Sequence, residues 1–183
     1  MADRVSFSQE EQDINDIAEM YNTAYRSLMH YKSAILSGTV AVPPNLVGLS
    51  LKELDDYFIH QLEEIGMTLC LNLIAATEAR FRKDFLIRVY ERFKDDLSVL
   101  FRNFYSDLKR QERENRISLE QHILDQWKEV YPSYKCFIGD FKGVLLLRHW
   151  LAHGRYWTRK FRKYDFSTVY TVCSNIINNL PLN

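Results

Sequence analysis

The chain has 183 residues whose charges cancel at neutral pH, and 46% of them are hydrophobic, against only six glycines and four prolines. This composition excludes a disordered or collagen-like chain, and the length suits a single domain, 1–183, with one core. No stretch approaches the ~18 uninterrupted apolar residues of a membrane span, and the first residues lack a secretory leader, so we expect a cytoplasmic protein that does not enter membranes.

A long amphipathic helix is predicted over residues 8–37. Ser8 and Glu11 have the spacing of a capping box, in which two side chains satisfy free amide groups at a helix start. Apolar residues then recur at the helical period as far as Ile35, and Gly38 predicts the end of the helix.

A second capping-box spacing, Ser50 to Glu53, predicts the start of a helical run that extends to Phe93. At ~1.5 Å per residue this run would be roughly 60 Å long, so we expect a bend or a break at Gly66. A helix of this length outgrows what a small core can cover, which favours a symmetric homodimer.

Shorter helices are predicted for the rest of the chain, and the charged stretch Lys109 to Arg116 is expected to be a solvated helix end and loop. We expect one helix capped at Asp95–Asp96, one capped at Ser118 and ended by Pro132, one over 133–154, and one from Asp165 to before Pro181. No hairpin turn stands between alternating apolar runs. The predicted fold is therefore all-α, with long antiparallel helices and about five to seven helices in total.

The sequence gives no sign of a metal or cofactor site. Cys70, Cys136 and Cys173 lie far apart, without the paired spacing of a zinc site, so we expect buried structural thiols. Three histidines lie away from any motif and are expected to be ordinary surface or core residues: His30, His60 and His122.

The segment Arg148–His153 places a guanidinium and two imidazoles near the end of the predicted helix 133–154. At ~100° per residue, Arg148 and His153 would point roughly 140° apart, whereas His149 and His153 share a face. Gly154 puts His153 in the last turn, where a long arginine side chain can curl around the helix end. Basic residues here would also complement the helix dipole without any catalytic role, and spacing alone does not decide between the two.

Basic and aromatic residues alternate directly after this segment. Such a combination can follow a phosphate backbone and stack on unpaired bases. Trp157 and Phe161 are also suited to anchor the core while the charges reach into water. Residues 67–183 carry an excess of seven positive charges, which suits a polyanion but can equally attract the acidic residues 1–66. The candidate substrate-binding residues are Arg155, Tyr156, Arg159 and Lys160.

The string from Arg148 to Gly154, placed late in an all-helical domain, resembles the Arg-x4-His motif of the HEPN superfamily. The resemblance implies an HEPN-like helical bundle and a metal-independent endoribonuclease that needs no cofactor. It also implies a homodimer that joins two motifs over one cleft to bind RNA. His153 would transfer protons, Arg148 would stabilise the phosphate, and His149 would orient the pair or contact the substrate.

Glu78 stands among apolar neighbours in the second helical run, and similar acidic residues in some HEPN proteins face the motif. A buried carboxylate needs a partner. Arg148 or His153 would supply one, but so would Arg80 or Arg82, and plain exposure is a further alternative.

The family resemblance favours a toxin or defence effector that cleaves single-stranded RNA and is restrained by an antitoxin or another regulatory protein. The first alternative is a non-catalytic HEPN module that binds a nucleotide or a protein partner. The second is a helical scaffold outside the family, for which Arg148 and His153 would point apart with no facing copy of the motif.

Overall fold

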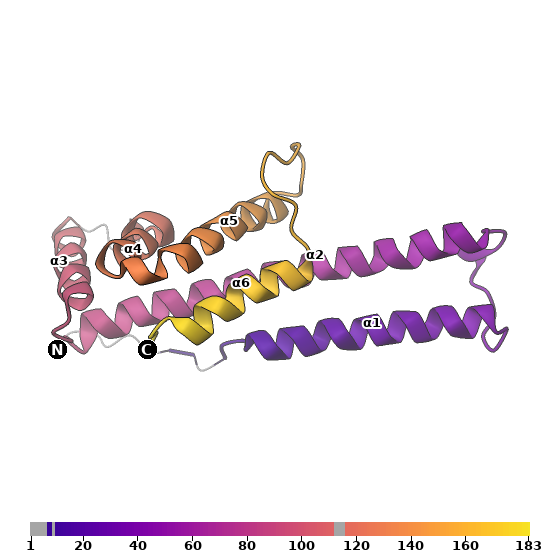
Figure 1. Ribbon diagram of the computed structural model, residues 1–183, viewed down its shortest axis with the longest axis horizontal. Coiled ribbons are helices and arrows are strands. Elements are labelled where there is room, and N and C mark those ends of the chain that lie inside the picture. Colours follow the sequence, from indigo (N-terminus) through magenta and orange to yellow (C-terminus); the bar gives the residue numbers. More distant parts are fainter. Residues whose placement is uncertain (1–6, 9, 112–115) are drawn as a thin grey trace.

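The computed structural model describes residues 7–8, 10–111 and 116–183, and every regular element in them is helical. These residues contain six α-helices, which confirms the all-α prediction (Figure 1). Helices α1, Ile14–Leu36, and α2, Leu51–Tyr90, form a long antiparallel hairpin. None of the described helices combines the length and the low charge that crossing a bilayer requires.

Helix α1 begins later than the sequence predicts. Its cap is Asp13, whose carboxylate accepts a hydrogen bond from the backbone amide of Asn15 at 2.7 Å. The capping box predicted at Ser8 does not form, because the Glu11 carboxylate binds Lys83 Nζ on α2 at 2.7 and 2.8 Å. The predicted start at residue 8 is therefore wrong, because a contact with α2 takes the side chain that the local motif needs.

Helix α2 begins with the predicted capping box. The Ser50 amide donates to the Glu53 carboxylate at 2.8 Å, and the Glu53 amide donates to Ser50 Oγ at 3.3 Å. The helix then continues for 40 residues through Gly66 without the predicted break. A Cβ at Gly66 would lie 3.3 Å from a ring atom of Tyr21 on α1. The glycine therefore permits close helix packing.

The other predicted helices are present with small changes in their bounds. Side chains cap three of them as predicted, namely Asp95, Ser118 and Asp165. The stretch Lys109 to Arg116 begins with the predicted helix end, since α3 ends at Arg110, and residues 112–115 lie outside the described residues. The observed elements are α3, Asp96–Arg110; a π-helical turn, Leu119–Leu124; α4, Asp125–Val130; a 3-10 turn, Pro132–Tyr134; α5, Lys135–Ala152; and α6, Phe166–Asn179.

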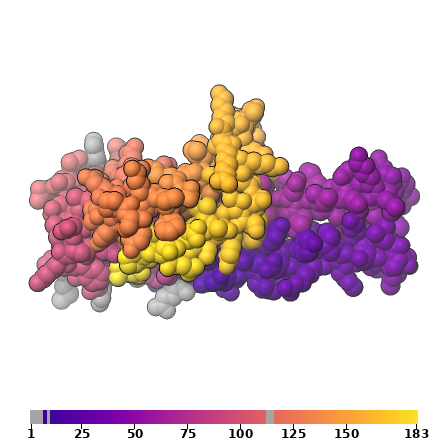
Figure 2. All heavy atoms as spheres, viewed as in Figure 1, coloured from indigo at the N-terminus to yellow at the C-terminus, as the bar shows by residue number. Residues whose placement is uncertain are grey.

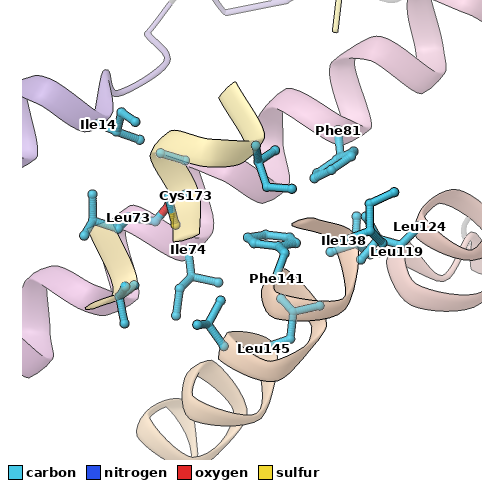
Figure 3. Close-up of a cluster of buried hydrophobic side chains, with 14 of the residues drawn as sticks. Ile14, Leu73, Ile74, Phe81, Leu119, Leu124, Ile138, Phe141, Leu145 and Cys173 are labelled. Atoms are coloured by element: carbon cyan, nitrogen blue, oxygen red, sulfur yellow. The ribbon is translucent and has the colours of Figure 1, made fainter. Parts of the chain in front are cut away.

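The main hydrophobic core lies where α2 meets α5 and α6 (Figure 3). Ile74 and Phe81 of α2 face Phe141 of α5 in this core, whereas Leu73 lies on the side of Cys173 of α6. A smaller apolar cluster holds the far end of the α1–α2 hairpin together, where α5 and α6 do not reach. The core therefore fixes α5, and with it the Arg148–His153 segment, against the middle of α2.

Two of the three cysteines are buried as predicted. Cys70 on α2 and Cys173 on α6 have no exposed surface, and burial raises the pKa of each thiol to about 12. Cys136 is exposed, so the prediction is wrong for this residue. It lies in the first turn of α5 with its side chain exposed.

Candidate functional site

The Arg148–His153 segment ends α5 in a Schellman motif. The amide of Arg155 donates to the carbonyl of Trp150 at 3.0 Å, and the amide of Gly154 donates to the carbonyl of Leu151 at 3.2 Å. Gly154 has φ 75°, a left-handed conformation that suits glycine, and confirms the predicted helix end. Arg155 follows with φ 59°, and the chain then turns into a loop that projects from the body of the molecule (Figure 2).

Glu78 on α2 forms an ion pair with Arg148. Arg148 Nε lies 3.3 Å from Glu78 Oε2, within ion-pair distance, while Glu78 Oε1 accepts hydrogen bonds from Arg82 Nε and Nη2 at 3.0 and 2.9 Å. The Glu78 side chain is only 12% exposed, against 44% for Arg148 and 45% for Arg82. Arg80 points elsewhere, with its guanidinium 3.9 Å from Glu11. One buried carboxylate thus contacts two guanidinium groups. Of the alternatives that the sequence left open for Glu78, pairing with Arg148 and pairing with Arg82 are both observed.

Arg148 and His149 open into one surface groove, which we call the motif groove. It has a volume of about 490 Å³ and lies between α2, the residues around Ser118 and α5. Its lining residues are Glu78, Arg82, Ser118, Leu119, Glu120, Leu145, Leu146, Arg148 and His149. A phosphate in this groove would meet Arg148 and Arg82 from one side, because both guanidinium groups are oriented by Glu78.

The two imidazoles of the motif are in contact. The rings of His149 and His153 lie edge to face, with centroids 4.4 Å apart and planes at 62°. Both rings also approach Trp157 in the loop, at 5.5 and 6.1 Å between centroids. Trp157 is itself held near the helix end, since its carbonyl accepts a hydrogen bond from Trp150 Nε1 at 2.8 Å. The helical spacing of four residues predicted this pair correctly.

Arg148 and His153 do not meet within one chain. Among the described residues, no hydrogen bond, ion pair or ring contact joins them, and His153 does not line the motif groove. His149 lies between the two, because it lines the groove and also touches the His153 ring. This is the divergence that helical geometry predicts for residues five positions apart.

The four predicted substrate-binding residues do not form a single patch. Arg155 Nη1 binds both oxygens of Glu64 on α2 at 2.8 Å, and Arg159 lies 4.8 Å over the ring of Trp150. Lys160 lines another groove with Trp157 and Phe161, and Tyr156 is 82% exposed at the loop surface. Only the tertiary packing of the loop separates these side chains, because in the sequence they are close neighbours.

Sequence reasoning missed two parts of the site. Leu146 is 52% exposed on α5 and lines both the motif groove and the groove that contains Lys160. The Ser118–Glu120 segment forms a wall of the motif groove from the other side. The exposed leucine could have been noticed as an apolar residue on the polar face of the helix, whereas nothing in the local sequence places residues 118–120 beside Arg148.

The described part of the chain contains no group of three or more histidine, cysteine or acidic side chains arranged to hold a metal ion. Comparison with models of protein families, with curated proteins and with solved structures finds no match for this chain.

Proposed function

We propose that this protein is a metal-independent endoribonuclease that cleaves single-stranded RNA. The observation that supports this proposal is the motif groove, where Arg148 is held by the buried carboxylate of Glu78 beside His149, whose ring contacts His153. The resemblance of Arg148–His153 to the HEPN motif supports the same reaction. These residues supply positive charge for a phosphate and imidazoles for proton transfer.

In the proposed reaction, the ribose 2′-oxygen attacks the adjacent phosphorus. The imidazole of His153 takes the 2′-hydroxyl proton, the bond between phosphorus and the 5′-oxygen breaks, and a protonated imidazole donates to that oxygen. The products are a 2′,3′-cyclic phosphate and a 5′-hydroxyl. Arg148 neutralises the charge that builds on the non-bridging oxygens, and His149 orients the His153 ring.

We propose that a second copy of the chain completes the site. Arg148 and His153 are separated within one chain, so a two-fold axis beside α5 would bring His153 of one copy toward Arg148 of the other. Leu146 supports this arrangement, because its exposed side chain stands between the motif groove and the next groove and would be covered by the second copy. Burial of such apolar surface favours association.

We also propose that the enzyme works in the cytoplasm as a toxin or defence effector under the restraint of a regulatory protein. Single-stranded RNA of the host would be a substrate as much as foreign RNA, since Arg148 and the imidazoles would act on a phosphodiester and a 2′-hydroxyl that every RNA strand carries. An inhibitor that covers Arg148 and His149, both exposed at the surface, would be sufficient to block cleavage.

The test is cleavage of a fluorogenic single-stranded RNA in the presence of EDTA. We expect His153→Ala and Arg148→Ala to lose on the order of 10²-fold or more in rate, the usual contribution of a proton-transfer residue. His60→Ala removes an exposed imidazole on α2, far from the groove, and should keep wild-type activity. Replacing the 2′-hydroxyl at the cut site with hydrogen should abolish cleavage. Equal rates for wild type and His153→Ala, or no cleavage by either protein, would contradict the proposal.

The non-catalytic module is the second candidate, and the lack of a contact between Arg148 and His153 among the described residues agrees equally with a helical scaffold outside the family. It predicts that no variant cleaves RNA and that His153→Ala leaves the binding of a nucleotide or protein partner unchanged. Leu146→Asp distinguishes the two candidates further. The variant should sediment as a monomer and lose cleavage if the second copy completes an active site, whereas the module should keep its partner.

A further inference from the structure

A separate cavity lies between the α1–α2 hairpin and residues 150–166. Its volume is about 550 Å³, within the range of small-molecule sites. Trp150 lines it, whereas Arg148 and His149 line the motif groove, so the two spaces lie on different faces of α5. We call it the aromatic cavity, and its lining includes Tyr21, Tyr25, Ile59, Trp150, Arg159 and Lys163.

The walls of the aromatic cavity suit a flat apolar ring. Tyr21 stacks on Phe166 with centroids 4.0 Å apart, and Tyr25 and Ile59 stay about half exposed beside them. Trp150 also lines the cavity, and its ring lies under the guanidinium groups of Arg155 and Arg159. Aromatic rings prefer to stack on other flat rings, and a ligand would cover the apolar surface that these residues leave in contact with water.

Most of the charged groups around the aromatic cavity already have partners. Arg155 binds Glu64, and the Asp165 carboxylate accepts hydrogen bonds from Thr168, which lower its pKa. Arg159 differs, because its Nη1 is buried without an acceptor among the described residues. Its guanidinium lies on the ring of Trp150 and makes no ion pair within the described residues, so its charge is available to an anion in the cavity that Arg159 lines.

The free charges limit the ligand to one acidic group. Lys163 lines the cavity and makes no hydrogen bond or ion pair within the described residues. Its charge contributes to the lowered pKa of Asp165, and it can join Arg159 in binding an anion. Glu63 also lines the cavity without a described partner and would repel a polyanion. Its carboxylate can instead accept a hydrogen bond from an N–H group on the ligand ring.

We infer that the aromatic cavity binds a planar aromatic molecule that carries a single carboxylate or phosphate, with the acidic group on Arg159 and Lys163. The inference does not depend on the proposed function, because it uses no residue of the motif groove. Binding would also hold the loop after α5 in place, since Trp150 and Arg155 belong both to the cavity wall and to the end of that helix.

The experiment is calorimetric titration of the whole chain with two acidic probes, AMP and indole-3-acetate, and with their uncharged counterparts, adenosine and indole-3-acetamide. We expect saturable binding of at least one acid, one ligand per chain, and at least tenfold weaker binding of its uncharged counterpart. Binding of AMP but not of indole-3-acetate identifies a phosphate ligand, and the reverse identifies a carboxylate ligand.

Two variants and a control connect the binding to the cavity. Arg159→Gln and the exposed Lys163→Gln should each weaken binding of the acid at least tenfold, and the second variant serves if the first does not fold. Arg162→Gln is the matched control, because this exposed arginine belongs to the same loop but does not line the cavity. The inference is overturned if neither acid binds or if charged and uncharged probes bind equally. It is also overturned if Lys163→Gln binds the acid as tightly as wild type and the Arg162→Gln control do.

Discussion

The buried ion pair between Asp84 and Arg88 on α2 gives the sharpest test of how this fold is held together. Arg88 Nε donates to both carboxylate oxygens of Asp84 at 2.9 Å, and the two side chains are 7% and 0% exposed. Arg88 also binds Asp95 at 3.1 Å, so it connects α2 to the start of α3. Asp84 accepts two further hydrogen bonds from Asn183, at 3.0 and 2.8 Å.

Removing one partner of a buried pair costs about 3–5 kcal/mol, because the other charge is left without compensation. Asp84→Ala should lower the free energy of unfolding by about 3 kcal/mol, since Arg88 keeps the Asp95 carboxylate as a partner. Arg88→Met should lower the free energy of unfolding by about 5 kcal/mol, because the fully buried Asp84 carboxylate then keeps only the neutral donors of Asn183. The double variant should cost less than the sum by about 2 kcal/mol, as coupled sites do.

The assay is urea unfolding followed by circular dichroism at neutral pH, with the free energy of unfolding extrapolated to water for all four proteins. Arg110→Met provides the control, because its ion pair with Asp107 is largely exposed and should contribute less than ~1 kcal/mol. The reasoning is refuted if Asp84→Ala and Arg88→Met both stay within 1 kcal/mol of wild type, or if their effects add without coupling.

Two further predictions concern titratable groups. In the native protein one thiol, Cys136, should react quickly with a thiol reagent at pH 8, whereas Cys70 and Cys173 should react only at the rate of unfolding, because burial holds their pKa near 12. Fast modification of all three in folded protein would contradict this. Asp165→Ala should lose about 1 kcal/mol of stability at pH 7, the usual cost of removing a helix cap. Hydrogen bonds lower the pKa of Asp165 in the folded state, so the contribution of this carboxylate to stability is present above the ordinary pKa of ~3.9 and is lost as the pH falls below it. The difference between the melting curves of wild type and Asp165→Ala should therefore shrink at pH 3. An equal difference in stability between wild type and Asp165→Ala at pH 7 and pH 3 would contradict the role of the Asp165 carboxylate as a helix cap.

Local sequence signals predicted the helices well where the stabilising contact is itself local. The caps at Ser50, Asp95 and Asp165 each bind a backbone amide within three residues, so no distant element is needed to form them. The Ser8–Glu11 spacing failed although it has the same form. Glu11 binds Lys83, 72 positions away, and an ion pair at that separation cannot be read from a local pattern.

The same distinction applies to the candidate site. Spacing alone places His149 beside His153 and separates Arg148 from His153, because one helix fixes all three directions. The sequence leaves Glu78 with several possible partners or with plain exposure, and only the packing of α5 on α2 buries it and gives it both Arg148 and Arg82.

The sequence by itself determined the all-helical fold, most helix ends and the pair of imidazoles at the end of α5, since each depends on residues within one or two helical turns. The tertiary structure decided which side chains share a space. It joined Glu78 to Arg148, divided the basic loop residues between two sites, and formed the aromatic cavity between α1, α2 and residues 150–166. These outcomes depend on contacts between elements far apart in the chain. Local sequence patterns do not show how closely or in which direction those elements pack against one another.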